Sequence, residues 1–517
     1  MSGQKKFYVT TPIYYPSSDL HIGHTYTTVA ADTMNRFKKL QGYDSYFITG
    51  TDEHGQKIEK IALEHNMSPQ EYVDGVVSGV KKLWDTMNVQ YNQFIRTTDV
   101  DHIETIQAIF RKLYEQGDIY KGKYEGLYCT PCESFWTESQ APDGICPDCK
   151  RKLEQASEEA YFFRMSKYAD RLLAYMEEHP DFIQPEARKN EMINNFIKPG
   201  LQDLCVSRTS FQWGVPVDFD PGHVVYVWID ALPNYLSALG YCNEKEDKMA
   251  SYWPPDLQLV GKDIIRFHTI YWPIILMALD LPLPEKIYGH GWILLKEGKM
   301  SKSLGNVVDP VELVKKYGTD ALRYYILREM NFGGDSAYSE DLLISRINSD
   351  LANDLGNLLN RTTAMTVKYF DGQIPPVREE RPEDEELKEQ MISLPGKVSK
   401  LMDQPDFAKA LETIWKAVSA TNKYIDENKP WALGKNPEEK DRLAQVMYQL
   451  SESLRFLGIL IGPFMPETGK KILDYLNVEE EYRSWNSLHA FGLCPFEKRY
   501  DRCEPLFPRI ERKKEKE

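Results

Sequence analysis

Residues 6–24 read KFYVTTPIYYPSSDLHIGH, and this stretch decides the fold class. Its first part, Lys6 to Tyr15, is rich in aromatic and β-branched residues and is followed by a proline, so we expect a strand that runs into a loop. Apolar residues then recur at helical spacing from Gly23 to Leu40, and a second strand is expected at Asp44 to Ile48. This order indicates an α/β fold, in which the amino end of the helix offers N–H groups to an anionic ligand at the carboxyl edge of the sheet.

A second half of the same α/β unit is expected farther along the chain. Strands are indicated at Val224 to Ile229, Leu257 to Val260 and Lys286 to Leu295, with a helix before the last of them. The stretch from Tyr161 to Gln202 is expected to hold helices and loops, so an insertion separates the two halves. From Pro310 onward, apolar faces at helical spacing favour a helical bundle.

Composition and charge limit the class of protein. The chain has 517 residues, of which 42% are hydrophobic and 27% charged, which excludes disordered and collagen-like architectures. The formal net charge is −15, so a polyanionic partner has to be met by local basic patches.

We find no apolar run of the roughly 18 residues that a membrane span needs. Met1 to Lys6 lacks the apolar core of a signal peptide, and a cytoplasmic protein with no membrane partner is expected.

The first candidate site is the HIGH segment between the first strand and the first helix. His21 and His24 are three residues apart, so both imidazoles lie on one face of the first helical turn. Beside the N–H groups of the helix end, they can donate hydrogen bonds to a triphosphate and stabilise the charge that grows on phosphorus. Gly23 lets a ligand approach the backbone closely. The alternative is a pair of surface or capping histidines.

The second candidate site is the KMSKS segment, which follows the strand ending near Leu295. Its glycine and serines make a pliable loop, and Lys299 and Lys302 put two mobile ammonium groups where a leaving pyrophosphate is held. The alternative is an ordinary pair of solvated lysines on an exposed loop. A histidine pair and this lysine pair in one α/β unit form an uncommon combination.

The third candidate site is a set of four cysteines in two CxxC pairs, Cys129 with Cys132 and Cys146 with Cys149. Two such hairpins bring four thiolates within tetrahedral reach of one Zn²⁺ ion. Four cysteines fill the coordination sphere, which favours a structural ion over a catalytic one. The alternatives are two disulfides or four free thiols.

HIGH at His21 to His24 and KMSKS at Lys299 to Ser303 resemble the two signatures of class I aminoacyl-tRNA synthetases, and the neighbouring residues resemble the methionyl-tRNA synthetase family. The resemblance covers almost the whole chain. It implies an α/β fold with a Rossmann-like parallel-sheet catalytic domain, split by a zinc-binding insertion and followed by an α-helical bundle that binds the anticodon. The implied ranges are 1–117 and 224–308 for the two catalytic halves, 118–223 for the connective insertion with its zinc knuckle, 309–345 for a stem-contact segment, 346–510 for the anticodon-binding domain and 511–517 for a charged tail.

The activity implied by the resemblance is ligation of methionine to tRNA. L-Methionine and ATP, with Mg²⁺, would give methionyl-adenylate, and the methionyl group would pass to the 3′-terminal adenosine of tRNA(Met), releasing AMP and diphosphate. The implied catalytic residues are His21, His24, Lys299 and Lys302. Nothing in the sequence resembles the further C-terminal module of some family members, so a monomer is expected.

An unbranched thioether calls for a pocket of aromatic and aliphatic walls. The family resemblance places the methionine site at Ile13, Tyr15, Asp52, Trp228, Ala231, Leu232, Tyr235, Ile264, His268 and Trp272. Asp52 is the carboxylate expected to pair with the substrate ammonium. Several family members have Ala-Leu-Pro-Tyr where this chain has Pro12-Ile13-Tyr14-Tyr15, and we take Ile13 as equivalent apolar lining. The alternatives are core tryptophans, a capping Asp52 and a buried, satisfied His268.

The remaining implied contacts concern ATP and the anticodon. The ATP site is expected at His21, Gly23, His24, Gly261, Asp263, Gly289, His290, Gly291, Trp292 and Lys302. Asn357, Arg361 and Trp431 match the positions that read the CAU anticodon, since splayed bases stack on an indole or guanidinium plane. The alternative is an ordinary exposed helix face. Two rival functions are another class I ligase, such as the cysteine enzyme, and a non-catalytic RNA-binding paralogue.

Overall fold

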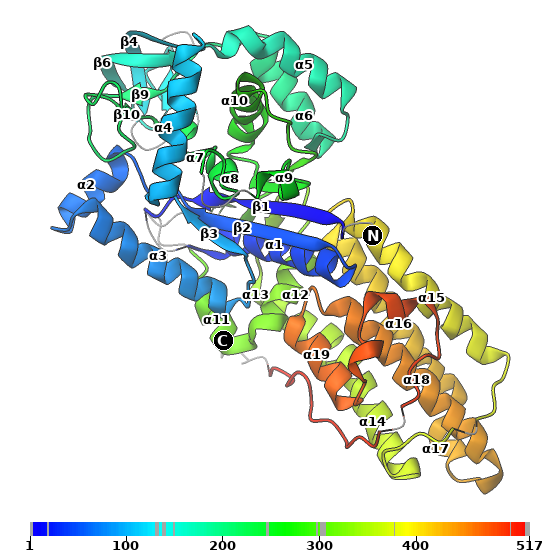
Figure 1. Ribbon diagram of the computed structural model, residues 1–517. Coiled ribbons are helices and arrows are strands. Elements are labelled where there is room, and N and C mark those ends of the chain that lie inside the picture. Colours follow the sequence, from blue (N-terminus) through cyan, green and yellow to red (C-terminus); the bar gives the residue numbers. More distant parts are fainter. Residues whose placement is uncertain are drawn as a thin grey trace.

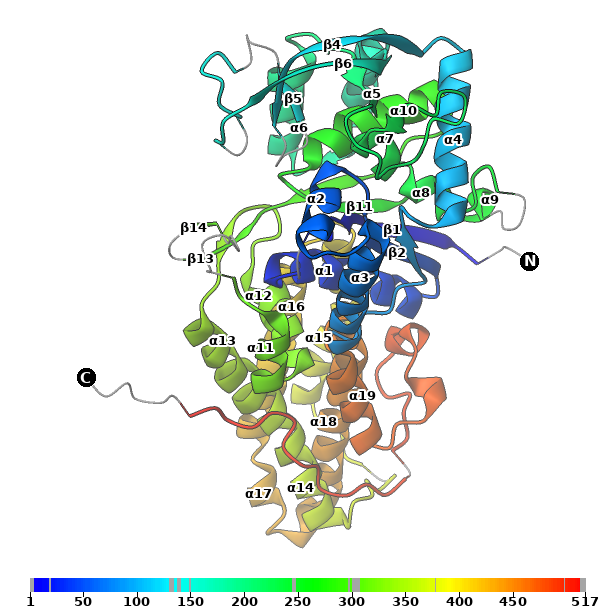
Figure 2. The ribbon, with the colours of Figure 1, turned by 90° about the vertical axis from the view of Figure 1, so that its left-hand side faces the viewer.

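The computed structural model describes residues 4–17, 20–129, 134–136, 141–147, 150–243, 248–295, 298–299, 307–376, 378–496 and 498–511. Figure 1 shows a central sheet, with a smaller α/β part on one side of it and a group of long helices on the other. In the view of Figure 2 these three parts follow one another along the length of the molecule. No helix in the described ranges is long and apolar enough to cross a membrane.

The central sheet has six strands, all parallel, in the order β3-β2-β1-β11-β12-β7. The strands are β1 (Lys6–Tyr14), β2 (Asp44–Thr51), β3 (Gln93–Arg96), β7 (Ile183–Gln184), β11 (Leu257–Gly261) and β12 (Ile287–His290). From β1 the chain adds β2 and β3 on one side, and it adds β11 and β12 on the other. The order of strands therefore reverses between β1 and β11, and ligands bind at the carboxyl ends of strands at such a switch point.

Helices cover both faces of this sheet. Phe7 and Val9 of β1 face one core, which they share with α1 (Ile22–Leu40) and α3 (Pro69–Thr86). Tyr8 faces the other core, with α4 (Val100–Glu115) and α10 (Trp272–Leu279). Successive side chains of a strand point to opposite faces, so the apolar run in β1 fills both layers.

The insertion contains a second, antiparallel sheet of four strands in the order β5-β4-β6-β8. These strands are β4 (Ile119–Cys129), β5 (Ser134–Trp136), β6 (Glu154–Phe163) and β8 (Leu204–Cys205). Helices α5 (Ala169–Glu178) and α6 (Glu186–Met192) follow β6. Strand β7 lies within the range predicted for the insertion, yet it pairs with β12 at the edge of the central sheet.

The helical part is built around α18 (Lys440–Ile461), in which every residue from Arg442 to Ile461 is buried. The other helices are α11 (Pro310–Tyr317), α12 (Thr319–Glu329), α13 (Glu340–Arg346), α14 (Asn357–Phe370), α15 (Glu383–Met402), α16 (Phe407–Asn428), α17 (Pro430–Leu433) and α19 (Pro466–Tyr475). A buried ion pair of 2.7 Å between Asp32 of α1 and Arg323 of α12 joins this part to the central sheet. Their apolar cores are continuous.

The predicted fold class, a parallel-sheet α/β domain followed by a helical bundle, is confirmed. The strand predicted at Val224 to Ile229 is wrong for most of its length: only Val224–Val225 pair as β10, and α7 (Val227–Ala231) follows. A short apolar run cannot be assigned to helix or strand from its pattern alone. The helical assignment from Tyr161 is also wrong at its start, because β6 continues to Phe163.

Candidate active site

The paired histidines of the HIGH segment lie at the amino end of α1, directly after the loop that follows β1. His21 is the N-cap residue, and its Nδ1 accepts a hydrogen bond from the Gly23 N–H at 3.0 Å. Nδ1 of His24 accepts from the His21 N–H at 3.1 Å, and the two ring centroids are 4.1 Å apart. A neutral imidazole whose Nδ1 accepts carries its proton on Nε2. Capping therefore makes both rings Nε2–H donors, so the capping and phosphate-binding interpretations are compatible.

Gly23 sits between the two rings and has no room for a side chain. A Cβ at this position would lie 2.8 Å from Cε1 of His21. Any other residue would displace the first imidazole from its capping position. The glycine predicted to admit a ligand therefore also sets the position of His21.

His290, at the end of β12, forms a hydrogen bond with a residue of α1. Its Nδ1 donates to the Gly291 carbonyl at 2.8 Å, and its Nε2 lies 2.6 Å from the hydroxyl of Thr27. Because Nδ1 carries the proton, Nε2 is the acceptor and Thr27 the donor. Burial lowers the pKa of His290, which keeps the ring neutral. The carboxyl end of β12 is thereby held against the helix that carries the histidine pair.

The predicted ATP residues after β11 and β12 converge. Trp292 Nε1 donates to Oδ1 of Asp263 at 3.1 Å, and a Cβ on Gly261 would lie 2.5 Å from that oxygen. A Cβ on Gly291 would lie 2.0 Å from the carbonyl oxygen of Gly334, so only glycine fits there. On Gly289 a Cβ would meet Cδ1 of Ile265 at 2.2 Å. The backbone of Gly334 thus accounts for Gly291, whereas a side chain at position 289 would have to displace the side chain of Ile265.

Two residues that the sequence did not indicate complete this group. Lys262 lies with its Nζ 4.1 Å from the ring centroid of Trp292 and donates to Asp335 at 2.6 Å. Asp335 also accepts from the Trp292 N–H at 2.9 Å. Burial acts to raise the pKa of Asp335, but the hydrogen bonds from Lys262 and the Trp292 N–H, together with the charges of Lys262 and Arg188, outweigh burial and lower the pKa. Asp335 belongs to no motif; its only signal is proximity in the fold.

The KMSKS segment is described only at its start. Gly298–Lys299 form β14, which pairs with β13 (Ile293–Leu295), and Lys299 lies opposite Leu294. β13 also pairs with β15 (Ser336–Ala337), next to Asp335. The backbone leading into the segment therefore runs beside the Trp292 group. The side chain of Lys299 and the whole of Lys302 lie outside the described residues.

Most of the predicted methionine residues share one core. Tyr235 donates through its hydroxyl to Nε2 of His268 at 2.8 Å, and Nδ1 of His268 donates to the Ile264 carbonyl at 3.0 Å. Burial lowers the pKa of His268 to about 4, so the ring is neutral near pH 7. Trp272 is 0% exposed and donates to Gln258 at 3.1 Å. The polar atoms of His268 and Trp272 thus have hydrogen-bond partners inside the core, which agrees with the alternatives of a buried histidine and a core tryptophan. Both rings pack against Tyr235.

The remaining apolar members line the same region. Trp228 is half-buried and stacks on Phe267, with ring centroids 3.6 Å apart and planes 10° from parallel. Ile13 and Ile264 are partly buried against the same core as Leu232, and Ala231, the residue before Leu232 in the chain, is buried as well. Phe267 was not predicted, although it precedes His268.

Asp52 and Tyr15 lie at the ends of the two adjacent strands β2 and β1. Asp52 is 7% exposed, and its N–H donates to the Tyr14 carbonyl at 3.0 Å. Tyr15 donates through its hydroxyl to the carbonyl of His54 at 3.3 Å. The helix that follows, α2 (Gln56–Glu64), begins after Gly55 as its N-cap, so Asp52 does not cap it. The capping alternative is therefore wrong.

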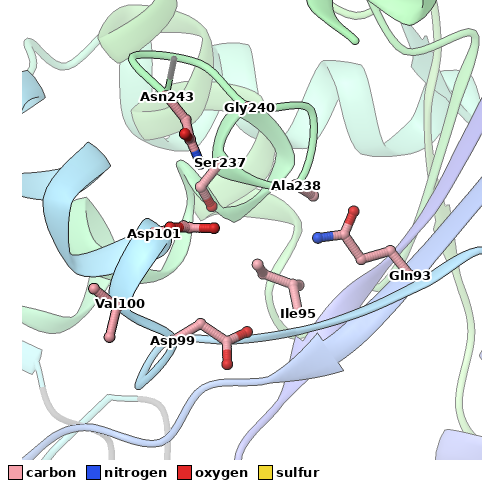
Figure 3. Close-up of a pocket in the computed structure, with 9 residues that line it drawn as sticks. All are labelled: Gln93, Ile95, Asp99, Val100, Asp101, Ser237, Ala238, Gly240 and Asn243. Carbon is pink, nitrogen blue, oxygen red and sulfur yellow. The ribbon is translucent and has the colours of Figure 1, made fainter. Parts of the chain in front are cut away.

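A cavity of about 370 Å³ lies near this region without containing any predicted site residue. Figure 3 shows carboxylate, amide and hydroxyl groups that reach toward it from β3, α4 and α8 (Asn234–Ser237). Its lining is Gln93, Ile95, Asp99, Val100, Asp101, Ser237, Ala238, Gly240 and Asn243. Ser237 lies both in the lining of this cavity and in α8, the helix that carries the predicted methionine residue Tyr235. Its Oγ lies 2.8 Å from Nδ1 of His102.

The predicted anticodon residues lie far from the sheet, where α14 and α17 end the molecule in Figure 2. Trp431 is 42% exposed, and the guanidinium carbon of Arg361 lies 5.8 Å from its ring centroid. Arg361 also donates to Asp426 at 2.9 Å. Asn357 is exposed at the start of α14. The fold thus brings together an exposed indole and a guanidinium from two distant segments.

Two of the four predicted zinc ligands are described. Cys129, at the end of β4, and Cys146 are buried in a small cluster with Trp136, Ala141 and Leu153. Cys132 and Cys149 lie outside the described residues. Buried thiols on both arms of the knuckle suit the soft donor set that Zn²⁺ prefers.

Within the described ranges, Glu159, Asp220 and His223 also bring ligand-type atoms within 4.8 Å of one another. The ammonium of Lys121 already lies 2.7 Å from Glu159 and 2.8 Å from Asp220. A lysine in that position supplies the positive charge that the two carboxylates need, and the group is an ion-pair cluster.

Comparison with known proteins relates the whole chain to one family. A family model described as tRNA synthetases class I (M) matches residues 7–157 and 151–363, and one described as the anticodon binding domain of methionyl tRNA ligase matches 374–517. The methionine–tRNA ligase of Caldanaerobacter subterraneus subsp. tengcongensis is 62% identical over 99% of this chain and 80% of its own length. That of Clostridium acetobutylicum is 58% identical over 99% of this chain and 79% of its own.

A solved structure has the same fold as this chain. Mycobacterium tuberculosis methionyl-tRNA synthetase in complex with methionyl-adenylate superposes with a TM-score of 0.93 at 40% identity. The match covers 98% of this chain and 100% of that one.

Proposed function

The chain belongs to the class I methionyl-tRNA synthetases, and from this premise we propose which of its residues carry out each part of the reaction. The activity is that of a methionine–tRNA ligase: methionine and ATP form methionyl-adenylate and diphosphate, and the methionyl group then passes to the 3′-terminal adenosine of tRNA(Met), releasing AMP.

We assign the phosphate chemistry to His21 and His24 together with Lys299 and Lys302. The methionine carboxylate oxygen attacks the α-phosphorus of the Mg²⁺-bound ATP, and the bond from phosphorus to the leaving pyrophosphate breaks. The support is the tautomer fixed at each histidine, because Nδ1 caps the helix and Nε2 carries a donor proton. Such donors act by position and charge on the five-coordinate phosphorus, without forming a covalent bond to it. The two lysines are assigned from the motif to the departing diphosphate.

The ATP itself is assigned to the switch point between β1 and β11. Gly23, Gly261, Gly289 and Gly291 are the close-approach positions, and Asp263, His290 and Trp292 are the polar and aromatic groups beside them. A neutral imidazole attracts phosphate groups less strongly than a charged one does. We therefore assign His290 to the adenosine part of ATP and not to its phosphates. The bond from Trp292 to Asp263 orients the indole as a surface for the base.

Methionine is assigned to the space between the Asp52 loop and the Trp228–Tyr235 segment. Asp52 supplies the negative charge for the substrate ammonium. Tyr235 and His268 bond to each other, which satisfies both polar groups and leaves the thioether an apolar lining from Trp228, Ile13 and their neighbours. Such a pocket discriminates modestly between side chains that differ by one methylene.

Recognition of tRNA(Met) is assigned to the far end of the helical part. An exposed indole beside a guanidinium offers two stacking surfaces for unpaired bases, and Asn357 offers an amide for their edges. On this support we assign anticodon recognition to Trp431 and Arg361, at the end of the bundle that is far from the histidine pair.

A structural Zn²⁺ is proposed at Cys129, Cys132, Cys146 and Cys149. The support is the burial of Cys129 and Cys146 with Trp136 in one small core. When bound, the ion would cross-link the two arms of the knuckle without taking part in the reaction. The domain ranges given by the resemblance are retained as a proposal, with β7 assigned to the central sheet that it extends.

The observation that carries the assignment is the capped histidine pair at the switch point, and substitution tests it. In His21→Ala and Lys302→Ala, methionine-dependent exchange of pyrophosphate into ATP should collapse while tRNA binding largely survives. Unchanged exchange in both variants would overturn the phosphate-site assignment. The same result would favour a different set of phosphate-binding residues.

A further inference from the structure

Asp230 is 0% exposed and lies between two histidines from distant parts of the chain. Its Oδ2 is 2.7 Å from Nδ1 of His54, and its Oδ1 is 2.9 Å from Nε2 of His102. We propose that Asp230, acting through His54 and His102, is a positioning residue that fixes the distance between the two sides of the methionine pocket and thereby sets the affinity for methionine. The inference rests on the proposed location of that pocket.

The charge state of the group is fixed by its surroundings. Burial acts to raise the pKa of Asp230, but the charges and hydrogen bonds of His54 and His102 outweigh it and hold the pKa at about 2. The carboxylate is therefore ionised near pH 7, and an ionised carboxylate only accepts hydrogen bonds. Nδ1 of His54 and Nε2 of His102 are both donors in this arrangement.

On one side, the group holds the loop that follows β2. His54 is two residues after Asp52, and its carbonyl accepts the Tyr15 hydroxyl at 3.3 Å. The next residue, Gly55, donates its N–H to the Trp213 carbonyl at 3.0 Å. The imidazole of His54 thus anchors the segment that carries the carboxylate assigned to the substrate ammonium.

On the other side, the group holds the helices that carry the side-chain pocket. Asp230 lies in α7 between Trp228 and Ala231. His102, from α4, continues the chain of hydrogen bonds to Ser237 of α8, the short helix that also carries Tyr235. One carboxylate therefore joins the Asp52 loop, α7, α4 and α8. The ammonium site and the thioether site are connected through it.

A carboxylate suits this position because it presents two equivalent acceptors. An asparagine offers one acceptor and one N–H₂ group, so one histidine N–H would face a donor. In a fully buried site that mismatch costs a hydrogen bond and forces one ring to turn or change tautomer. Either adjustment moves the Asp52 loop relative to α7.

The distal end of the network reaches the cavity of Figure 3. Ser237 lines that cavity and lies 2.8 Å from His102, so Ser237→Ala removes the last bond without disturbing the carboxylate. The pocket depends on the bonds of Asp230 to His54 and to His102, and substitutions of His102 test the second of these bonds.

Steady-state pyrophosphate exchange on the full chain tests the inference, with KM for methionine, KM for ATP and kcat measured for each variant. Asp230→Asn should raise the methionine KM at least about tenfold, the effect of losing one charge-assisted hydrogen bond. The KM for ATP should stay within about twofold, because none of the side-chain hydrogen bonds described for Asp230, His54 and His102 goes to β11 or β12. His102→Gln, which keeps a donor toward Asp230, should stay near wild type, and His102→Leu should behave as Asp230→Asn does.

A matched control is Glu452→Gln, a change of the same kind at a carboxylate that is 0% exposed and bonded by both nitrogens of the Arg455 fork. It should lower the melting temperature and leave both KM values unchanged. Equal changes in the methionine and ATP KM values, or a His102→Gln variant as impaired as His102→Leu, would overturn the inference and reduce Asp230 to a structural group. If Asp230→Asn does not fold, the two His102 variants decide.

Asp52→Asn separates this inference from the proposed function. A raised methionine KM in Asp52→Asn with an unaltered KM in Asp230→Asn would retain the pocket and reject the positioning role. Unaltered methionine KM values in both variants would reject the pocket itself.

Discussion

The hydroxyl of Thr27 lies 2.6 Å from Nε2 of His290, and this contact ties helix α1 to strand β12 across the switch point of the sheet. This contact therefore fixes the position of the histidine pair at the start of α1 relative to the GHGW segment at the end of β12. The two halves of the α/β domain, separated in the sequence by the insertion, meet at this hydrogen bond.

Thr27→Val removes the hydroxyl and keeps the shape of the side chain. The loss of one neutral hydrogen bond, about 0.5–1.5 kcal/mol, should raise the KM for ATP roughly 2–10-fold. The KM for methionine should change less, because its assigned pocket lies on the other side of β1. Exchange kinetics at varied ATP check this. Thr27→Ser, which restores the donor, should recover most of the wild-type value.

Stability should fall as the pH drops from about 6.5 toward 4. His268 has a pKa of about 4 in the folded protein because burial disfavours its charged form, whereas an unfolded histidine titrates near 6.5. The unfolded chain therefore binds more protons in this window, and protonation favours unfolding as the pH falls. His290, whose pKa is lowered for the same reason, contributes with the same sign. Urea unfolding between pH 4 and 7 checks the slope, which His268→Gln should reduce.

Breaking the buried pair between Asp32 and Arg323 should destabilise the junction of the two parts. Both side chains are 0% exposed, and Arg323 also donates to the carbonyls of Phe464 and Met87. Arg323→Met removes one of the two arginines that pair with Asp32, and Arg36 remains 2.8 Å from the same carboxylate. The cost should therefore stay below the roughly 3–5 kcal/mol of a buried charge that loses every partner. Denaturant unfolding measures it, with Lys409→Ala, at an exposed pair, as the control.

The sequence predicts those parts of the site that are contiguous in the chain. HIGH could be placed because a strand, a loop and a helix follow one another within a few residues, whereas the GHGW residues were assigned through the family resemblance. The structure puts HIGH at the start of α1 and GHGW at the end of β12. Lys262 and Asp335, which contact the predicted Trp292, and the group around Asp230 were missed, since these contacts form only when segments far apart in sequence pack together.

The pattern of apolar residues along the chain also fails to predict the type and position of very short helices and strands. β7 has only two residues, Ile183 and Gln184, and its membership of the central sheet depends entirely on its neighbour β12. α7 lies within an apolar run whose composition suits a strand equally well. Long amphipathic segments such as α16 carry a clear period and were predicted as helices.

Trp431→Ala should impair charging of tRNA while leaving methionine activation intact. Loss of one stacked base costs about 1–3 kcal/mol, so kcat/KM for tRNA should fall roughly 5–150-fold. Pyrophosphate exchange without tRNA should be unchanged, because α17 lies at the end of the helical part that is far from the central sheet (Figure 2). Trp431→Phe, which keeps an aromatic surface, should retain most of the activity. Equal loss of charging and exchange would show a general defect in folding.

Cys146→Ser should release zinc from the purified protein. Four thiolates hold a structural ion, and replacing one with a hydroxyl removes a soft donor from the set. Metal analysis should find about one Zn²⁺ per wild-type chain and much less in the variant. Cys205→Ser, at a buried cysteine outside the knuckle, is the control and should keep its metal.

The assignment of the methionine pocket and the phosphate site is tested most directly by pyrophosphate exchange into ATP, run without tRNA and with each of the twenty amino acids in turn. Exchange with methionine, and at most weak exchange with any other amino acid, is the predicted result. Strong exchange with a different amino acid would contradict the pocket while keeping the phosphate site, and no exchange with any of them would contradict both.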